Sequence, residues 1–370
     1  MYLALRDLRF AKGRFLLMGG VVALITLLLV LLSGLTAGLG NQSTSALAAL
    51  PADQIVFGAP AGDSAKASFT ESEVTRGQLA EWAARDDVAH AELLGISQSR
   101  FQAIDPSGTP SGTASVAVFG TAGIEGAGTA GLAPGPVAEG TVLIGASLAS
   151  ELGLRAGSLA TVGGTELTVS GVVPDQWYSH TGVVWTTLAD WRTLAHITGK
   201  DAAATVIAVT SDGGQTLDAA AANASAGTVS TTRDGSFQAL GSYKSENGSL
   251  LLMQAFLYGI SALVIVAFLT VWTVQRTRDV AVLKALGGSS GYVLKDAMVQ
   301  AAVVLLAGAA AGGAAGVAGG VLAARAAPFL LTPQTTLLPV AGIVVLGLAG
   351  AALAVRSITR VDPLLALGGN

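Results

Sequence analysis

The chain has 370 residues, of which 51% are hydrophobic and only 12% are charged, against about 25% charged residues in typical soluble domains. This balance excludes an ordinary soluble enzyme and predicts residence in a membrane. The sequence has no cysteine, which excludes disulfide bonds and thiol catalysis. Its net charge of -4 gives no reason to expect a nucleic acid among the partners.

Four long apolar stretches cover residues 15–39, 250–274, 297–324 and 337–355. Each is long enough to cross a hydrocarbon core about 30 Å thick as a helix. None of them contains Asp, Glu, Lys, Arg or His, so the buried ionisable residue typical of proton-coupled carriers and ion channels is missing. We therefore predict four transmembrane α-helices in a protein that draws its energy from elsewhere.

The charges around these stretches predict their orientation. Residues 1–14, 275–296 and 356–370 together hold ten basic and four acidic residues, whereas residues 40–249 hold nine basic and twenty acidic ones. Positive segments stay on the cytoplasmic side, so both termini and the middle loop are expected there. The chain would then be a multi-pass protein of the cell membrane, in contact with its lipids, with a large extracytoplasmic domain and a short external loop at 325–336.

The N-terminal region admits two alternatives. Basic residues before the first stretch and Ala46-Leu47-Ala48 after it resemble a secretory signal peptide, but the apolar run of roughly 25 residues exceeds the usual length. In residues 1–14, Tyr2, Leu5 and Leu8 recur every three residues beside two arginines. This spacing predicts a short amphipathic helix on the inner membrane surface, unless the arginines serve only as a topology signal.

Residues 40–249 alternate strand-like and helix-like segments, so we predict an α+β domain in two lobes. The pair Gly163-Gly164 predicts a hairpin, and Thr70-Glu71-Ser72-Glu73 matches a capping box that would open a helix reaching about Arg85. Residues 212–249 are expected to form a helical or flexible stalk. Strands are predicted at 53–58, 88–103, 115–119, 141–144, 158–162, 166–173, 183–186 and 205–210, and further helices at 146–152 and 190–196.

The third apolar stretch carries glycines four residues apart, at Gly308, Gly312, Gly316 and Gly320. Such a ridge allows two helices to approach closely in a membrane. It would serve either as a surface that slides during transport or as static packing.

Searches for catalytic motifs find little. The chain has no G-x-x-x-x-G-K-[ST] loop, so it lacks that route to ATP hydrolysis. Residues 126–131 match G-x-G-x-x-G but lead into prolines rather than a helix. His90, His180 and His196 are too widely separated to predict a metal site. We therefore expect no enzymatic activity, no cofactor and no metal in the chain alone.

The loop after the second stretch has a pattern of its own. Val280, Leu283 and Leu286 fall on one helical face, and two glycines suited to a helix end follow at 287 and 288. A short amphipathic helix at the inner membrane surface is predicted, with a simple connector as the alternative.

This segment, Arg276-Thr277-Arg278-Asp279-Val280-Ala281-Val282-Leu283-Lys284-Ala285-Leu286-Gly287, resembles the signature of FtsX/MacB-type ABC transporter permeases. The tail at 360–367 and residues 153–158 and 169–173 are also similar to that family. The resemblance implies a homodimeric permease bound to two copies of a separate cytoplasmic ATPase, which holds ATP and Mg. The residues it places at or near the ATPase contact are Arg276, Arg278, Asp279, Leu283, Lys284 and Gly287.

The N-terminal run of residues 1–15 resembles the haem-exporting branch of the family, the HrtB-type permeases of Gram-positive bacteria, which implies haem as a substrate. At the start of the second stretch, one helical face carries Asn247, Gln254, Tyr258 and Ser261, and the adjacent strip carries Glu246 and Met253. Tyr243 lies just before this stretch. These side chains are candidates for substrate binding, unless they only form hydrogen bonds between helices. The candidates are Glu246, Asn247, Met253, Gln254 and Tyr258, and Tyr258, Met253 and Glu246 are candidate ligands of the haem iron.

Two other functions are compatible with this architecture. One is a signalling module like FtsX itself, which transports nothing and regulates a cell-wall hydrolase. The other is an exporter of lipoproteins or peptides.

Overall fold

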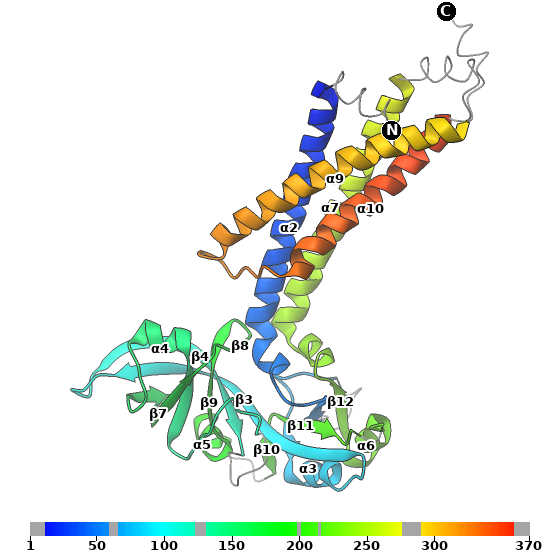
Figure 1. Cartoon of the computed structure of the whole chain (residues 1–370). Helices are drawn as coiled ribbons and strands as arrows, with labels where there is room; N and C mark the ends of the chain where they lie inside the picture. The colour runs from blue at the N-terminus through cyan, green and yellow to red at the C-terminus, as the bar shows by residue number, and fades with distance from the viewer. Residues whose placement is uncertain are drawn as a thin grey trace, which may run out of the picture. The chain divides into compact units, whose positions relative to one another are not determined.

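The computed structural model describes residues 12–58, 66–122, 131–197, 201–213, 216–275 and 290–358. The chain divides into a helical unit, made of residues up to Leu39 and from Asn247 onward, and a second unit, Gly40–Glu246 (Figure 1). The second unit contains all of the described strands.

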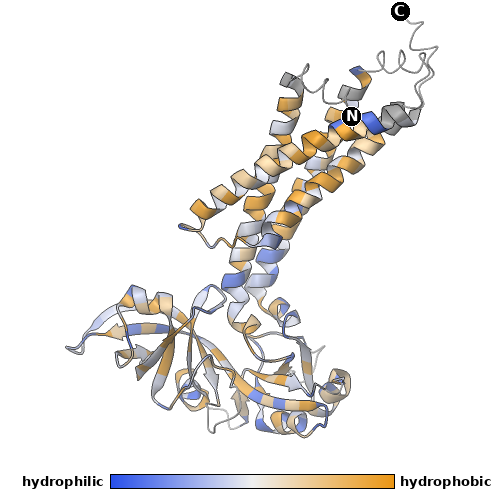
Figure 2. Ribbon diagram, viewed as in Figure 1, coloured by the Kyte–Doolittle hydropathy of each residue, from blue (hydrophilic) through white to orange (hydrophobic). Residues whose placement is uncertain are grey.

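The four long helices are α2 (Lys12–Ala48), α7 (Gly241–Gln275), α9 (Ser290–Ala323) and α10 (Pro333–Ile358). Each contains a segment that is long and apolar enough to span a membrane, and apolar residues colour most of their length in Figure 2. The prediction of four transmembrane helices is confirmed. α10 begins where Thr332 Oγ1 accepts a hydrogen bond from Thr335 N at 3.1 Å, with proline at the first helical position.

Small residues let α9 lie directly against α2. A Cβ atom added at Gly312 would lie 2.1 Å from the carbonyl oxygen of Ala23, and one at Gly308 would lie 2.7 Å from that of Gly19. No side chain fits at either position unless the two helices separate. The predicted close contact of the glycine ridge is therefore confirmed.

The connection between α9 and α10 packs into a notch in α2. A Cβ atom at Gly34 would lie 2.2 Å from the ring of Phe329, and one at Gly38 would lie 2.1 Å from Pro328 O. The backbone N–H of Leu330 donates to Gly34 O at 3.0 Å. Two glycines one helical turn apart thus create the space that this loop fills.

The second unit is built around one long mixed sheet, and its strand order is β12-β1-β11-β3-β4-β9-β5-β7-β6. Its central strand β3 (Val88–Ile104) pairs with β11 along its first part and with β4 along its second part. The bounds of the other strands are β1 Gln54–Gly58, β2 Val74–Thr75, β4 Pro110–Thr121, β5 Thr141–Gly145, β6 Leu159–Val162, β7 Thr165–Val173, β8 Trp177–Tyr178, β9 Thr181–Thr187, β10 Ala202–Ala204, β11 Val206–Ser211 and β12 Thr228–Thr232.

Two lobes share β3. In one lobe β6 pairs back onto the end of β3, which closes a ring of six strands around a core that includes Phe101 and Val118. In the other lobe, Val56, Trp82 and Ile207 belong to a core that α3 and α6 help to form. The remaining elements are α3 Arg76–Ala83, α4 Ala146–Leu152, α5 Leu188–Leu194, α6 Ala219–Ala226 and the 3-10 helix η1 Gly235–Ala239.

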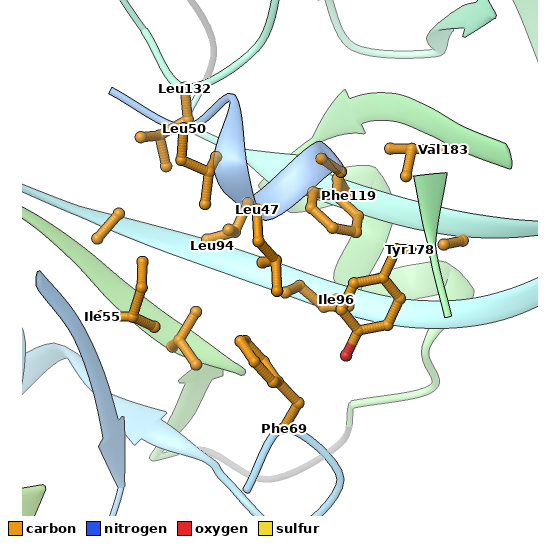
Figure 3. Close-up of a cluster of buried hydrophobic side chains, with 14 of the residues drawn as sticks. Leu47, Leu50, Ile55, Phe69, Leu94, Ile96, Phe119, Leu132, Tyr178 and Val183 are labelled. Carbon is orange, nitrogen blue, oxygen red and sulfur yellow. The ribbon is translucent and has the colours of Figure 1, made fainter. Parts of the chain in front are cut away.

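A third buried cluster contains the last turn of α2 and the residues just after it. Leu47 and Leu50 are fully buried there together with Ile55, Leu94 and Phe119 (Figure 3). Burying a leucine side chain stabilises a fold by about 1.5–3 kcal/mol. The end of α2 is therefore an integral part of the core of the second unit.

Two local predictions for this unit are wrong. The capping box lies at Thr75 and Gln78, not at Thr70–Glu73, and it opens α3 at Arg76. Ser72 instead accepts a hydrogen bond from Gly58 N and donates to Thr205 O. Residues 212–249 are not a simple stalk, because their described part contains α6 and β12, which pairs with β1.

The hairpin prediction is confirmed. Val162 pairs with Thr165 across Gly163 and Gly164, whose φ angles are 56° and 87°. Consecutive positive φ angles suit the tight turns that match the twist of two strands, and glycine reaches them without steric cost.

Candidate functional site

The predicted site residues fall into three groups. The six residues of the predicted ATPase contact, Arg276 to Gly287, lie outside the residues that the structure describes. Glu246 belongs to the second unit, and Asn247, Met253, Gln254 and Tyr258 belong to the helical unit.

Glu246 is held by a histidine from the turn between β8 and β9. The Nε2 atom of His180 lies 2.9 Å from Glu246 Oε2 and 3.1 Å from Ser43 Oγ. The side chains are partly exposed, at 31% for His180 and 42% for Glu246. The pair is charged only when His180 is protonated, and solvent screening limits such exposed pairs to about 0–1 kcal/mol.

The backbone of the same turn binds the end of α2. Ser179 N donates to Ser43 O and His180 N donates to Gln42 O, each at 3.0 Å. Ser179 and His180 have φ angles of 48° and 65°, which are uncommon for residues other than glycine. Such strain persists only where the surrounding contacts hold it. We call this turn, with its contacts to Ser43 and Glu246, the clamp.

Further hydrogen bonds extend the clamp along both helices. Trp177 N donates to Ser45 Oγ on α2 at 2.9 Å, and Ser179 Oγ lies 3.2 Å from Ser242 Oγ on α7. The β8–β9 turn therefore ties the last turns of α2 to the first turn of α7. No local sequence pattern predicts this contact, because His180 and Glu246 are 66 positions apart.

Tyr243 packs inside the second unit. Its ring lies edge-on to Phe237 with centroids 6.0 Å apart, and it contacts the core that surrounds Leu47. Hydrophobic packing accounts for its position.

In the helical unit, two of the candidate residues join helices. Gln254 Nε2 donates to Thr36 Oγ1 on α2 at 3.1 Å. The ring of Tyr258 lies against α10, 3.1 Å from where a Cβ atom of Gly342 would be. Both contacts agree with the alternative that these side chains link helices.

The other candidates on α7 are more accessible. Met253 is 52% exposed, and Asn247 is half-buried. Met253 shares its surroundings with exposed apolar side chains, among them Leu252 and Phe256. This surface of α7 offers a thioether among apolar groups. No cluster of three or more His, Asp or Glu suited to a metal ion occurs within the described ranges.

Two family models match this chain. The MacB-like periplasmic core domain matches residues 15–226, and the FtsX-like permease C-terminal domain matches residues 251–363. Together they cover α9 and α10, most of α2 and α7, and most of the second unit.

Similar proteins include two that are named putative hemin transport system permease protein HrtB. The one from Staphylococcus epidermidis is 27% identical over 144 residues, which is 39% of this chain and 41% of that protein. The one from Staphylococcus haemolyticus is 29% identical over 130 residues, which is 35% of this chain and 37% of that protein. The matched regions thus span less than half the length of these relatives.

Similar solved structures include the periplasmic region of MacB from Actinobacillus actinomycetemcomitans, at 11% identity and a TM-score of 0.35 over 51% of this chain and 92% of that one. Another is the extracellular domain of the ABC-type transporter YknZ from Gram-positive bacteria, at 11% identity and a TM-score of 0.33 over 49% and 98% of the two chains.

Proposed function

The chain belongs to the FtsX/MacB-type family of ABC transporter permeases, and on this premise we propose that it is the membrane subunit of an ATP-driven exporter of haem. The observation that carries the permease assignment is the pair of family matches over residues 15–226 and 251–363. The substrate is supported by the relatives named as hemin transport permeases.

The energy would come from two copies of a cytoplasmic ATPase bound to a homodimer of this chain. The apolar stretches hold no ionisable residue, and the sequence has no phosphate-binding loop of the G-x-x-x-x-G-K-[ST] type, so a partner must supply the driving force. Both termini and residues 276–289 would then face the cytoplasm, as the distribution of basic residues indicates. The coupling residues Arg276, Arg278, Asp279, Leu283, Lys284 and Gly287 would meet the ATPase there.

The clamp gives the extracytoplasmic domain a way to respond to the helices. Because the β8–β9 turn binds the last turns of α2 and the first turn of α7, a change in the spacing of these two segments must either move the turn or break its hydrogen bonds. A motion driven from the cytoplasm would reach the domain along the same two helices. This would be a mechanical relay, with no chemistry in the chain itself.

Haem would be bound from the outer leaflet through side chains at the start of α7. Methionine sulfur, tyrosine oxygen and carboxylate oxygen all ligate haem iron, which makes Met253, Tyr258 and Glu246 the candidates. Met253 is exposed, whereas Tyr258 packs against Gly342 and Glu246 is bound to His180. Met253 needs the least rearrangement, and Glu246 would have to leave His180 first. Asn247 and Gln254 would contribute polar contacts beside them.

A haem titration of the detergent-solubilised chain, followed by absorption, tests this proposal. We expect Met253→Leu and Glu246→Gln each to weaken binding by about tenfold or more. Leu252→Ala is the matched control, because Leu252 is equally exposed on the same helix and cannot ligate iron. The substrate assignment fails if haem does not bind the unmodified chain and does not stimulate ATP hydrolysis by the complex with its ATPase.

Two other measurements separate the alternative functions. A signalling module would hydrolyse ATP without any exported substrate, and its external domain would retain a cell-wall hydrolase. An exporter of lipoproteins would, on depletion, leave lipoproteins in the membrane.

A further inference from the structure

The second unit contains a cavity of about 470 Å³ beside the clamp. It is bounded by the turn at Phe69–Thr70, by Ile96–Gln98 of β3, by Tyr178–Ser179, and by Ala239–Ser242 at the start of α7. A smaller cavity of about 250 Å³ shares Phe69, Thr70, Ile96 and Ser97 with it. The volume is within the range of small-molecule pockets, about 300–1,000 Å³.

One hydroxyl group on the wall of this cavity is open to a ligand. Tyr178 is only 6% exposed, and its ring packs edge-on against Phe69 and Phe119 with centroids 5.8 and 5.4 Å away. Its hydroxyl forms no hydrogen bond within the described part of the chain, and Tyr178 is among the residues that line the cavity. Because no buried side-chain oxygen among the described residues lacks a partner, this hydroxyl oxygen keeps some accessible surface and can accept a ligand. Figure 3 shows this hydroxyl pointing away from Phe119 and Val183.

This hydroxyl is a hydrogen-bond donor at physiological pH. Desolvation raises the pKa of Tyr178 well above its ordinary value, so the phenol stays protonated at any physiological pH. A protonated phenol in an apolar wall is suited to a carbonyl or ether oxygen.

The other lining residues indicate the polarity and charge of the ligand that would fit. Phe69, Ile96 and Leu240 provide an apolar wall, and serine hydroxyls lie at the edge, where Ser179 and Ser242 bond to each other. The described lining includes no Asp, Glu, Lys, Arg or His. An anionic group such as a porphyrin carboxylate would therefore lose its hydration without gaining a charged partner.

We propose that this cavity is a binding site for an uncharged amphiphile, with its apolar part against Phe69 and Ile96 and an oxygen acceptor on the Tyr178 hydroxyl. The ligand would lie against the Ser179–Ser242 hydrogen bond and so against the clamp. The lining includes none of the candidate haem ligands Glu246, Met253 and Tyr258, and the proposal does not depend on haem being the exported compound.

Photolabelling of the full-length chain in detergent tests the site. Two uncharged probes are used in parallel, a diazirine-bearing monoacylglycerol and benzophenone, with a diazirine-bearing fatty acid as the anionic comparison. Mass spectrometry of the peptides then locates the label. We expect saturable labelling of peptides that contain Phe69, Ile96–Gln98 or Tyr178, several-fold stronger with an uncharged probe than with the fatty acid.

Two variants test the role of the lining. Tyr178→Phe removes only the hydroxyl and should lower labelling several-fold, and Gln98→Trp at the exposed rim should block the cavity even if Tyr178→Phe fails to fold. Tyr243→Phe is the control, since Tyr243 is not among the lining residues and packs on Phe237. Preference for the acylglycerol indicates a lipid, and preference for benzophenone indicates an aromatic compound.

Three results would each overturn the proposal. These results are label in the transmembrane peptides alone, labelling of the cavity by the fatty acid as strong as by the uncharged probes, and unchanged labelling in Gln98→Trp.

Discussion

His180 Nε2 lies 2.9 Å from Glu246 Oε2, and this contact joins the β8–β9 turn to the second turn of α7. The same nitrogen lies 3.1 Å from Ser43 Oγ on α2. A single imidazole therefore bridges two helices that are about 200 residues apart in the sequence, beyond the range of any local signal.

The contribution of this contact can be separated from that of the turn backbone. We expect His180→Ala to lower the free energy of unfolding of the detergent-solubilised chain by about 1 kcal/mol or less, because the pair is partly exposed, and this would be measured as a small drop in the thermal midpoint. Glu246→Gln should have a similar effect, and the double variant should cost less than the two single changes together. Full additivity would show that the two side chains do not interact.

If Glu246 binds haem iron as proposed, the two variants should differ in a haem titration. His180→Ala frees the carboxylate and should preserve or strengthen binding, whereas Glu246→Gln should weaken it. Equal losses in both would instead indicate that the clamp only shapes the domain.

The notch in α2 predicts that a larger side chain at Gly34 destabilises the chain and that a second substitution relieves this effect. Gly34→Ala places a Cβ atom 2.2 Å from the Phe329 ring and should destabilise the chain by about 1–3 kcal/mol, measured as a lower temperature of aggregation in detergent. Adding Phe329→Ala should restore part of the loss, since it removes the ring. Gly20→Ala on the same helix is the control, because a Cβ atom there meets nothing within 4 Å. Equal effects of the two glycine substitutions would contradict the notch.

The glycine ridge of α9 can be tested in the same way. Gly312→Ala should destabilise the chain by about 1–3 kcal/mol, because its Cβ atom would lie 2.1 Å from Ala23 O. Gly319→Ala should be neutral, since a Cβ atom there meets only Leu31 at an ordinary 3.5 Å. Comparing ATP-driven export with thermal stability for Gly312→Ala then separates the two roles of the ridge. A loss of export larger than the loss of stability favours a sliding surface, and parallel losses favour static packing.

The coupling loop predicts a functional effect. Leu283→Asp puts a charge on the apolar face of the predicted amphipathic helix and should abolish the stimulation of ATP hydrolysis by substrate. Ala285→Asp is the matched control, because two positions further on a helix the side chain points to the opposite side. Unchanged coupling in Leu283→Asp would argue against a role for this loop.

The sequence predicts the transmembrane helices and the hairpin at Gly163-Gly164 because each follows from a local rule. The length of an apolar run decides the first, and two positive φ angles decide the second. Local rules fail where two similar patterns compete. Thr70–Glu73 and Thr75–Gln78 both fit a capping box, and the tertiary hydrogen bonds of Ser72 to Gly58 and Thr205 leave the second as the start of α3.

The candidate site was harder to predict, since its contacts are formed between distant segments. Sequence spacing placed Gln254 and Tyr258 on α7 as polar candidates, but it could not show that Thr36 and Gly342 would be their neighbours. The place of the Tyr178 hydroxyl on a cavity wall had no local signal either, because the rest of that wall comes from β3 and from the segment before α7.

The shared strand β3 makes the extracytoplasmic unit indivisible. Its first part is bonded to β11 and its last part to β4 and β6, so one continuous strand belongs to both lobes. A cut within residues 88–104 would leave each fragment with an unpaired sheet edge. We therefore expect that neither lobe would be stable when produced alone. For the same reason, we expect a displacement of one lobe to displace the other, because both are hydrogen-bonded to the backbone of β3.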